Sequence, residues 1–381
     1  MNFNLTEEQQ ALKELAKSFA QKEIQPQIAS WEETETFPRH VFDKMGELGF
    51  NGMLVPGEYG GSELGRLTTA LVLEELAICG MAVSGYLAVH NMTANCVATY
   101  GSKELRDRFL PSLATGEKLA AFALTEANAG SDAANLESTA DRQGDQYLLN
   151  GNKIFITSGG EADVYLVMAK TDKSSGAKGI SAFLVEKGAA GLEFGKKESK
   201  MGFNASPTRE VIFNDCAVPA SNLLGREGDG FRYAMHALDG GRINTAIVAI
   251  GLAQGALDEA ASYARQRVQF GRPIASFQGI QFMLADMAMA VQQARLLVYY
   301  AASLMDENKP ATAQAAMAKC AATDASMKVT TDAVQIFGGY GYTREYPVER
   351  LMREAKMGQI VEGTNQIQRL VIARDLLEKQ L

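Results

Sequence analysis

"DQYLLNGNKIFIT", residues 145–157, lies in the region 117–225, in which the sequence changes from a helical to a strand-like pattern. Two runs rich in Leu, Ile, Tyr and Phe flank the pair Asn150-Gly151. An Asn-Gly pair between two such runs is a strong signal for a tight β-hairpin. We therefore predict a hairpin turn at Asn150-Gly151 and a β domain around it.

Three further segments of the same kind lie within residues 117–225. Each is short, rich in Val, Ile, Phe and Tyr, and separated from the next by polar turns. They are "DVYLVMAKT" (163–171), "GISAFLVEK" (179–187) and "REVIFNDCAVP" (209–219). Several short strands with turns between them are typical of a small barrel or sandwich.

The sequence on both sides of this region predicts helices. Thr6 followed by Gln9 forms a capping-box pattern, and a Gly-rich loop (56–65) precedes a second helical run (67–80). After residue 226 the helical segments are long, and Ala and Met dominate their apolar positions. We expect them at 229–268, 276–305, 311–337, 346–357 and 363–378. The fold class is thus α+β, mainly α, with domains at 1–116, 117–225 and 226–381.

The composition excludes several classes of protein. The 381 residues are 46% hydrophobic and 22% charged, as in an ordinary soluble globular protein. The net charge is −8 and no dense Lys/Arg run occurs, which argues against binding to nucleic acid or an anionic membrane. The first residues, "MNFNLTEEQQ", lack the basic-then-apolar pattern expected of a signal peptide, and no apolar run is long enough to span a bilayer.

Cysteines and histidines are few and scattered. The four cysteines include no CxxC pair, which is typical of a reduced, cytoplasmic protein. A metal site needs clustered ligands, and His40, His90 and His236 lie far apart in the sequence. We therefore expect no metal centre.

Five small-residue loops carry the chemistry that remains after these exclusions. The chain has no Rossmann or P-loop glycine motif and no serine nucleophile elbow. Glycine, hydroxyl and amide groups instead gather at 125–134, 155–160, 267–273, 335–343 and 362–368. Such loops suit a pyrophosphate-linked cofactor held by backbone amides. Taken singly, each loop is more typical of a structural turn or a helix cap than of a cofactor site.

One acid stands out in the last of these loops. Within "QIVEGTNQIQRL" (359–370), Glu362 is the sole ionisable side chain between Lys356 and Arg369. By itself it could serve as a first-turn glutamate that complements a helix dipole.

The loops together, in this order and at this spacing, resemble the acyl-CoA dehydrogenase family over essentially the whole chain. The motifs are "LTEANAGSD", "YLLNGNKIFITSGG", "RVQFGRPIASFQGIQFMLADMA", "QIFGGYGYTREYPVERLMREAK" and "QIVEGTNQIQR". The resemblance implies an N-terminal helical domain, a middle β domain and a C-terminal four-helix bundle, with FAD between the last two. It also implies a homotetramer built as a dimer of dimers, and reoxidation by electron-transfer flavoprotein.

The reaction that the resemblance implies is α,β-dehydrogenation of an acyl-CoA. Glu362 matches the family's catalytic base, which removes the α-proton while hydride leaves the β-carbon for FAD. Burial by the bound ligand should raise the pKa of Glu362 toward that of a useful base, and the uncharged, half-apolar stretch around it helps to desolvate the carboxyl group. The thioester oxygen is expected to accept hydrogen bonds from the backbone N–H of Glu362 and a ribityl hydroxyl of FAD.

Other site residues carry over by position. Thr125 and Thr157 are expected to bond the flavin ring, and Ser131 the pyrophosphate or the CoA arm. The FAD contacts within one subunit are Phe122, Leu124, Thr125, Ser131, Phe155, Thr157, Thr364 and Gln366. The residues expected to close over the FAD of a partner subunit are Arg267, Phe270, Gln335 and Gly339. The acyl-CoA contacts are Ser131, Asp239, Arg242, Val361 and Gly363; Arg242 could also be merely a solvated helix charge.

The chain departs from the family pattern at four places. Ala127-Asn128 replaces a common Pro-Gly, which removes a φ-fixing proline from the first loop. Phe155 stands where tryptophan is common, and Val361 where many members have tyrosine. In one subgroup the base lies just before the matching arginine, but that position here is Gly241, which leaves the role to Glu362.

Three stretches favour a branched substrate. "HNM" (90–92), "GFNASPTR" (202–209) and "GGRIN" (240–244) look most like isobutyryl-CoA dehydrogenases of valine breakdown. We expect a short, 2-methyl-branched acyl-CoA, with butyryl-CoA (fatty acid β-oxidation) and 2-methylbutyryl-CoA as competitors. His90 is expected either near the acyl pocket or as a satisfied core histidine.

Other members of the same fold are less favoured. Acyl-CoA oxidases are usually much longer chains, and flavin monooxygenases of this fold typically lack the base. A non-catalytic, nucleic-acid-binding member would need a basic surface, whereas the pI is about 5.2.

Overall fold

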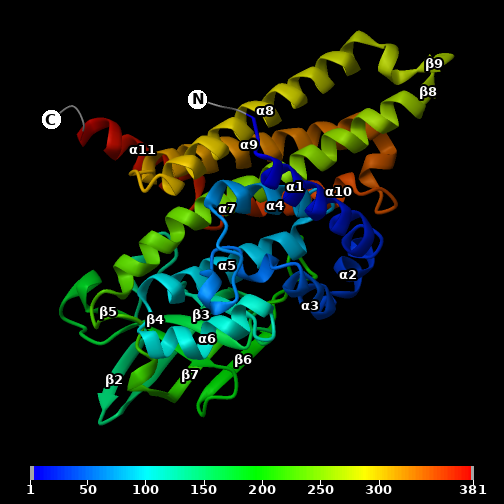
Figure 1. The fold of residues 1–381 in the computed structure, drawn as a ribbon. Coiled ribbons are helices and arrows are strands. Elements are labelled where there is room, and N and C mark those ends of the chain that lie inside the picture. The colour runs from blue at the N-terminus through cyan, green and yellow to red at the C-terminus, as the bar shows by residue number, and fades with distance from the viewer. Residues whose placement is uncertain (1–3, 379–381) are drawn as a thin grey trace.

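A computed structural model describes residues 4–378, so the first three and last three residues of the outer predicted domains lie outside it. Figure 1 shows helices at both ends of the chain and a β domain between them. The N-terminal helices are α1 (Glu7–Phe19), a π-turn (Ala20–Ile24), α2 (Ile28–Thr34), α3 (Arg39–Glu47), α4 (Arg66–Ala77), α5 (Met81–Tyr100) and α6 (Lys103–Thr115).

The predicted capping box is confirmed. The Thr6 hydroxyl accepts from the Gln9 N–H at 3.1 Å, and Gln9 Oε1 accepts from the Thr6 N–H at 3.0 Å. These two bonds satisfy donors that the first turn of α1 otherwise leaves unpaired.

The middle region is one mixed sheet folded over a shared core. Its strands are β1 (Ala120–Ala123), β2 (Thr139–Gln143), β3 (Gln146–Thr157), β4 (Val164–Lys170), β5 (Ile180–Glu186), β6 (Leu192–Lys197) and β7 (Thr208–Pro219). β2, β3, β7 and β6 pair antiparallel, while β4 pairs with β1 in parallel and with β5 antiparallel. A single pairing, Thr139 with Lys170, joins the two halves. Apolar side chains from both halves meet between them, as expected for a barrel or sandwich.

The predicted hairpin at Asn150-Gly151 is wrong. β3 runs unbroken through both residues, and the chain instead reverses at Gly144 (φ 63°), between β2 and β3. Gly151 (φ 138°) lies where the register of β3 against β7 shifts, which is a β-bulge. The strand continues because it pairs with β7, which is twelve residues long, and the extra residue at Gly151 is accommodated as a bulge and not as a turn.

The C-terminal helices lie close to their predicted positions. They are α7 (Gly230–Gln266), α8 (Gln278–Asp306), α9 (Thr312–Phe337), α10 (Val348–Gly358) and α11 (Asn365–Glu378). The short strands β8 (Val268–Gln269) and β9 (Arg272–Pro273) connect α7 to α8. Short 3₁₀ turns lie at 50–52, 57–59, 133–135, 176–179, 220–222, 274–276 and 338–342. The predicted domain boundaries fall in connections between these elements, and we retain them as a proposal.

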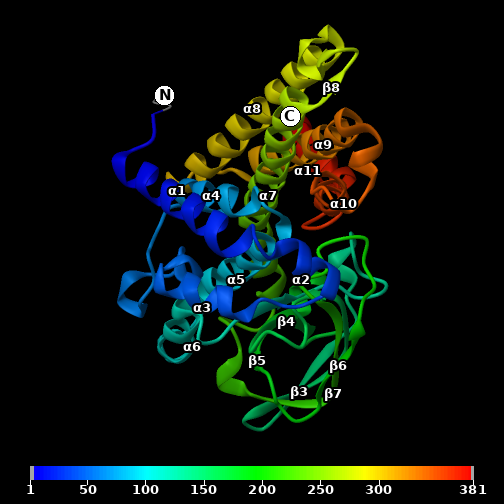
Figure 2. The ribbon, with the colours of Figure 1, turned by 90° about the vertical axis from the view of Figure 1, so that its right-hand side faces the viewer.

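The layers place α5 at the centre of the molecule. In Figures 1 and 2, the C-terminal helices form the upper layer, the β domain the lower one, and α5 lies between them. Residues 81–88 of α5 belong to the core shared with the bundle, whereas Met92 to Val97 belong to the core shared with the β domain. α7 continues from the β domain to the β8–β9 hairpin at the opposite end of the molecule.

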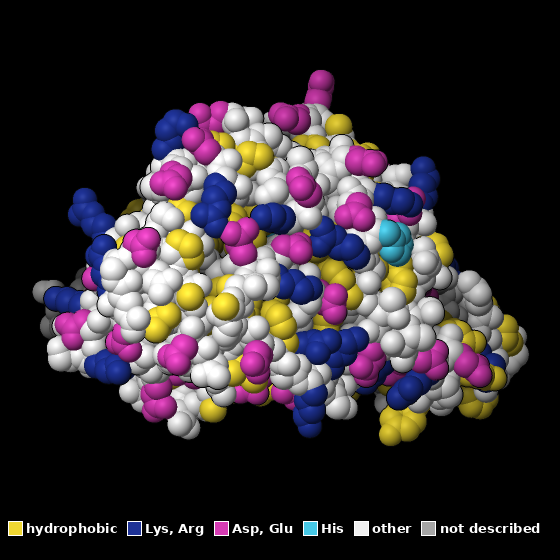
Figure 3. Space-filling model, turned by 90° about the horizontal axis from the view of Figure 1, so that it is seen from below, with side chains coloured by type: hydrophobic (Ala, Val, Ile, Leu, Met, Phe, Trp, Pro, Cys, Tyr) yellow, Lys and Arg dark blue, Asp and Glu magenta, His cyan; other side chains and the backbone are white. Residues whose placement is uncertain are grey.

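The surface charge, the hydrophobicity of the helices and the grouping of possible metal ligands each bear on the kinds of partner that the chain could bind. Figure 3 shows basic and acidic side chains intermixed over the lower face, with no single-sign patch there. Among the described residues, no helix is both long and apolar enough to cross a membrane. The same part of the chain contains no cluster of three His, Cys, Asp or Glu side chains able to hold a metal.

Replacing Gly151 by alanine should destabilise the protein by about 2 kcal/mol. A Cβ there lies 2.4 Å from Ser138 Oγ, at a φ that L-residues rarely adopt. Gly144→Asn is the matched control, because Gly144 has open space around it and Asn tolerates its φ. Thermal melting should show a drop of several degrees for Gly151→Ala alone. An equal or larger drop for Gly144→Asn would contradict the close packing assigned to Gly151.

Candidate active site

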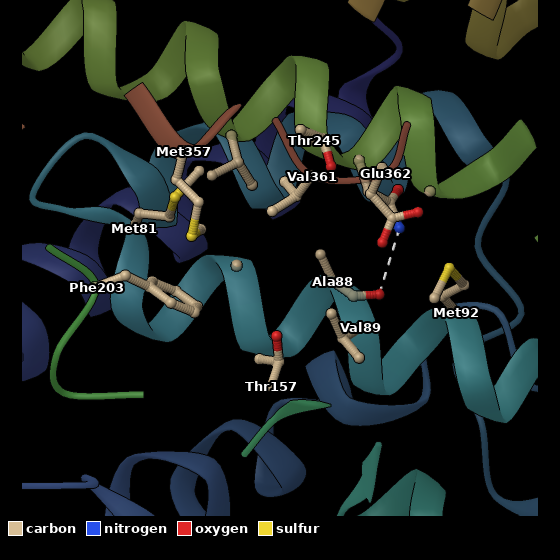
Figure 4. A pocket seen from close by; sticks show the side chains of 14 residues that line it. Met81, Ala88, Val89, Met92, Thr157, Phe203, Thr245, Met357, Val361 and Glu362 are labelled. Carbon is tan, nitrogen blue, oxygen red and sulfur yellow. Dashed lines mark hydrogen bonds between the residues drawn. The ribbon is translucent and has the colours of Figure 1, made fainter. Parts of the chain in front are cut away.

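A small, mostly apolar cavity of about 60 Å³ lies between α5, α7 and the segment that joins α10 to α11. Figure 4 shows Met81, Phe203 and Met357 at one end and Glu362 beside Met92 at the other. Thr157, from the end of β3, closes the cavity from the β domain. The lining residues are Met81, Gly85, Ala88, Val89, Met92, Thr157, Phe203, Gly241, Asn244, Thr245, Val248, Met357, Val361 and Glu362.

Glu362 carries the ionisable group of this cavity. The residue as a whole is half-buried, but its Oε2 has almost no exposed surface and no hydrogen-bond partner within the described chain. Burial raises the pKa of Glu362 to about 7, while the positive charges of Arg242 and Lys319 act in the opposite direction. The cavity therefore holds a carboxyl group that changes its charge near neutral pH.

Gly241 makes room for this carboxyl group. A Cβ at Gly241 would lie 2.4 Å from Glu362 Oε2 and 3.0 Å from Met92 Sδ. The space that a side chain at position 241 would need is therefore filled by the Glu362 side chain.

The backbone around Glu362 is held in an unusual turn. Glu362 has φ 55° and Gly363 has φ 84°, so two consecutive residues are left-handed. Gln368 Nε2 donates to the carbonyls of Glu362 and Gly363 at 3.0 and 2.9 Å. Lys319 Nζ donates to the Gly363 carbonyl at 2.9 Å and to Asn365 Oδ1 at 2.9 Å. These bonds fix the turn that directs Glu362 into the cavity.

Arg242 and Asp239 form a pair on α7. Arg242 Nη1 lies 2.6 Å from Asp239 Oδ1, and Asp239 Oδ2 accepts from the Thr312 hydroxyl at 2.8 Å. Arg242 is buried and its Nε has no partner within the described residues. This side chain is therefore no solvated helix charge, and it retains a donor for a further acceptor.

The β domain presents an uncharged face beside the cavity. The hydroxyls of Thr125 and Thr157 are half-buried, and among the described residues no hydrogen bond to them is found. Phe155 is 63% exposed at φ 56°, so its ring is free to contact another planar group. Free hydroxyls, an exposed aromatic ring and open space at Gly130 fit the flavin of FAD.

The loop that carries Thr125 is anchored without the missing proline. Glu126 is buried, pairs with the fully buried Lys153 at 2.6 Å, and accepts the backbone N–H of Ser138 at 3.0 Å. Lys153 also donates to the Leu124 carbonyl at 3.2 Å. This buried pair holds the loop at both of its ends, while Ala127 and Asn128 are exposed.

A second, larger groove lies at the far end of the molecule. Its volume is about 860 Å³, and it lies beside the β8–β9 hairpin. Arg267, Phe270 and Gly339 line it, and Phe270 is 94% exposed at φ 51°. Figures 1 and 2 place this hairpin at the end of the molecule opposite the β domain. These three residues are thus distant from Thr125 and Thr157 of the same chain.

The structure therefore distributes the predicted site residues over several places. Val361, Gly363 and Thr157 lie with Glu362 at the cavity or its turn, and Phe122 and Leu124 lie on β1 and just after it. Ser131, Gln335 and Gln366 are exposed, and Ser131 does not line the cavity. Thr364 caps α11 by accepting the Ile367 N–H at 3.3 Å.

His90 is a satisfied core histidine. It has no exposed surface, its Nε2 is paired with the Leu113 carbonyl at 3.0 Å, and its Nδ1 accepts the Ala120 N–H at 3.0 Å. Burial lowers the pKa of His90 to about 4. Of the two expectations for this residue, the structure supports the core one.

Sequence reasoning missed two kinds of site residue. The apolar wall, notably Met81, Met92 and Met357, reads in the sequence as ordinary helix core. Lys319 and Gln368 hold the turn, and the signal for Lys319 was its charge within the apolar run "AAMAKCAA" (315–322).

Comparisons with known proteins match this fold. Models of the acyl-CoA dehydrogenase N-terminal, middle and C-terminal domains match residues 6–117, 121–216 and 228–377. The mitochondrial isobutyryl-CoA dehydrogenase of Dictyostelium discoideum is 46% identical over 98% of this chain and 90% of its own length.

Solved structures agree over the whole fold. Butyryl-CoA dehydrogenase from Megasphaera elsdenii is 47% identical with a TM-score of 0.97, covering 99% of this chain and 100% of its own. A chain from a study of the electron-transferring flavoprotein of Acidaminococcus fermentans and flavin-based electron bifurcation is 52% identical, with a TM-score of 0.98 and the same coverage.

The protein is thus an oxidoreductase of the flavin-dependent class, and FAD is its cofactor. The chain belongs to the acyl-CoA dehydrogenase family. The fold class and the family expected from the sequence are confirmed.

Glu362 should make the stability of the protein depend on pH. Its pKa is about 7 in the folded protein and about 4.3 in an unfolded chain, so the folded state keeps a proton that the unfolded state has released. Relative to Glu362→Gln, the free energy of unfolding of the wild type should therefore fall by roughly 3 kcal/mol as pH rises from 4.3 to 7, with little further change above pH 7.

Melting temperatures of both proteins, measured from pH 5 to 8, test this expectation. Glu193→Gln, at an exposed glutamate of β6, controls for the loss of one negative charge. A constant difference between wild type and Glu362→Gln across this range would contradict the raised pKa.

Proposed function

We propose that this protein catalyses α,β-dehydrogenation of a short acyl-CoA, with isobutyryl-CoA as the favoured substrate. The observation that carries the proposal is the Glu362 carboxyl group, buried without a partner at one end of a small apolar cavity. A carboxylate in that setting is a stronger base than one in water, because it lacks solvation. Such a base suits the removal of a weakly acidic α-proton.

Residues of this chain would bind and orient the thioester beside that base. Among the described residues, the backbone N–H of Glu362 donates to no backbone carbonyl. It is therefore available to the thioester oxygen, where negative charge develops as the α-proton leaves. When bound, FAD supplies the acceptor for the hydride that leaves the β-carbon. Thr125, Thr157 and Phe155 would hold its flavin ring, with Phe122 and Leu124 behind them.

The remaining contacts are proposed from position. Thr364, Gln366 and Ser131 would contact the rest of the FAD or the CoA arm. Arg242, whose Nε is unpaired, would bind an acceptor on the CoA moiety, with Asp239 fixing its orientation. Val361 and Gly363 would flank the acyl group.

The size of the cavity favours a short acyl group. Met81, Phe203 and Met357 close the end opposite Glu362. The backbones of this end are anchored, because Glu32 accepts the N–H groups of Asn204 and Ala205 at 2.9 Å each. Glu354 likewise accepts the Met81 N–H at 2.7 Å. A longer chain would have to displace fixed side chains.

The choice among short substrates rests on three stretches of sequence and on the substrates of the relatives. The relative from Dictyostelium discoideum is an isobutyryl-CoA dehydrogenase, whereas the solved structure from Megasphaera elsdenii is a butyryl-CoA dehydrogenase. Isobutyryl-CoA, and with it a role in valine breakdown, is favoured by the three stretches noted in the sequence. Butyryl-CoA, as in fatty acid β-oxidation, is equally supported by the relatives, and 2-methylbutyryl-CoA is the third candidate.

Assembly and electron transfer are also proposed. Arg267, Phe270 and Gly339, with Gln335 nearby, would close over the FAD of a partner subunit, because they lie far from the FAD face of their own. A homotetramer would cover the apolar side chains that α8 exposes, which are Phe282, Met289, Leu296, Leu297 and Tyr300. Electron-transfer flavoprotein is the expected electron acceptor and the cytoplasm the expected compartment.

An anaerobic titration of the yellow enzyme tests the function directly. Isobutyryl-, butyryl-, 2-methylbutyryl- and octanoyl-CoA are added in turn, and isobutyryl-CoA should bleach the flavin most completely. Bleaching led by butyryl-CoA would keep the reaction and change the substrate. Glu362→Gln should bind FAD and acyl-CoA but lose turnover by about three orders of magnitude or more. Near-normal turnover in that variant would remove Glu362 as the base.

Shortening Phe203 should lengthen the preferred acyl chain. Phe203→Ala opens the end of the cavity, so kcat/KM for hexanoyl-CoA relative to isobutyryl-CoA should rise by about tenfold or more. Met201→Ala is the control, since Met201 belongs to the same loop but is 58% exposed and does not line the cavity. An unchanged ratio in Phe203→Ala would show that another wall limits the chain.

A further inference from the structure

Lys319 is a buried lysine on α9, directly behind the turn that carries Glu362. It has no exposed surface, and it is the sole charged side chain between Lys309 and Asp324. Its Nζ donates to the Gly363 carbonyl and to Asn365 Oδ1, both at 2.9 Å. Neither acceptor carries a charge.

No carboxylate of the described chain lies within ion-pair distance, 4 Å, of Lys319 Nζ. Burying a cation without such a partner costs several kcal/mol, and a neutral amide could donate to the same two acceptors. The hydrogen bonds alone therefore do not account for a lysine at this position. A buried positive charge at this position is explained if it stabilises a negative charge on a nearby group.

Glu362 is that group. Its carboxyl oxygen has no hydrogen-bond partner, and the positive groups that act on it are Arg242 from α7 and Lys319 from α9. Arg242 is already paired with Asp239 at 2.6 Å. Asp324, which also faces Lys319, is paired with Arg369 at 2.9 Å. Arg242 and Lys319 both act on Glu362, and of these two cations Lys319 is the one that is not paired with a carboxylate of the described chain.

We propose that Lys319 is a positioning residue for the base: it fixes the turn through Gly363, and its charge favours the ionised form of the buried Glu362 carboxyl group between turnovers. The proposal rests on the proposed role of Glu362. Lys319 donates to the Gly363 carbonyl, so the same side chain acts on the geometry of the turn and on the charge state of Glu362. A neutral side chain at 319 could preserve the first effect but not the second.

Among the other described groups around this pair, Arg242 also acts on Glu362, but its charge is shared with Asp239. Arg242, Asp324 and Cys320 face Lys319, and burial lowers the pKa of Lys319 to about 8. Towards Glu362, α5 presents Met92 and β3 presents Thr157, neither of which titrates near neutral pH. Because Lys319 lowers the pKa of Glu362 from the value that burial alone would give, removing its charge should raise that pKa above about 7.

The test compares Lys319→Gln, which keeps a hydrogen-bond donor, with Lys319→Met, which does not. Lys328→Met is the control, because Lys328 lies on the same helix but is 62% exposed and pairs with Asp332. The readouts are the pH profile of kcat/KM and the pH dependence of the melting temperature, together with flavin content. In both Lys319 variants the acid limb of the profile should move to higher pH by about one unit, a tenfold loss near pH 6. Lys328→Met should leave it in place.

The outcomes separate this proposal from the function on which it rests. A wild type that no acyl-CoA bleaches would remove the proposed function. An active wild type, together with folded, flavin-containing Lys319 variants whose acid limb is unmoved, would overturn the role of Lys319 alone. If neither variant folds, Nζ-¹⁵N NMR of Lys319 in Glu362→Gln gives the reciprocal test. Its pKa should fall below the wild-type value, and an unchanged value would refute the coupling.

Discussion

The burial of one carboxyl group without a partner is the constraint on which the rest of the site depends. A carboxylate taken from water without hydrogen bonds is costly, and it persists only where the surrounding structure fixes it in place. Here the space comes from Gly241, the direction from two consecutive left-handed residues, and the anchoring from Gln368 and Lys319. Each of these features, taken alone, is unfavourable or neutral for the stability of the fold. Together they place an acid whose pKa lies near 7 at the end of an apolar cavity.

The cavity itself is a product of the layering. Helix α5 lies between the bundle and the β domain, and it is apolar on nearly all sides because it contributes to both cores. The wall of the cavity is therefore shared among helices, a strand end and a loop that are far apart in the sequence. Buried acids outside the wall, Glu32 and Glu354, hold the backbones that carry Phe203 and Met81. The polar network thus sets the shape of an apolar pocket.

The same architecture separates two surfaces of one chain. The uncharged face around Thr125, Thr157 and Phe155 lies on the β domain, whereas the groove around Arg267 and Phe270 lies at the opposite end of α7. The long α7 sets the distance between these two surfaces. A cofactor that needs both surfaces needs two chains, which is the physical basis of the assembly that we propose.

Sequence patterns and tertiary contacts determined different parts of this protein. The helix positions, the capping box at Thr6 and the β character of residues 117–225 follow from local spacing and propensity, which depend on near neighbours in the chain. The motif order likewise identified the family, and it singled out Glu362 as the candidate base. The bulge at Gly151 depends on pairing with β7, so local turn chemistry predicted a hairpin that does not form. The sequence does not distinguish the roles of His90, Phe203 and Lys319, because the role of each depends on what it contacts in the fold. The sequence by itself determined which elements form and which acid to suspect. The raised pKa of Glu362, the size of the cavity and the cation behind Glu362 were decided by the tertiary structure, because each depends on the burial and packing of segments that lie far apart along the chain.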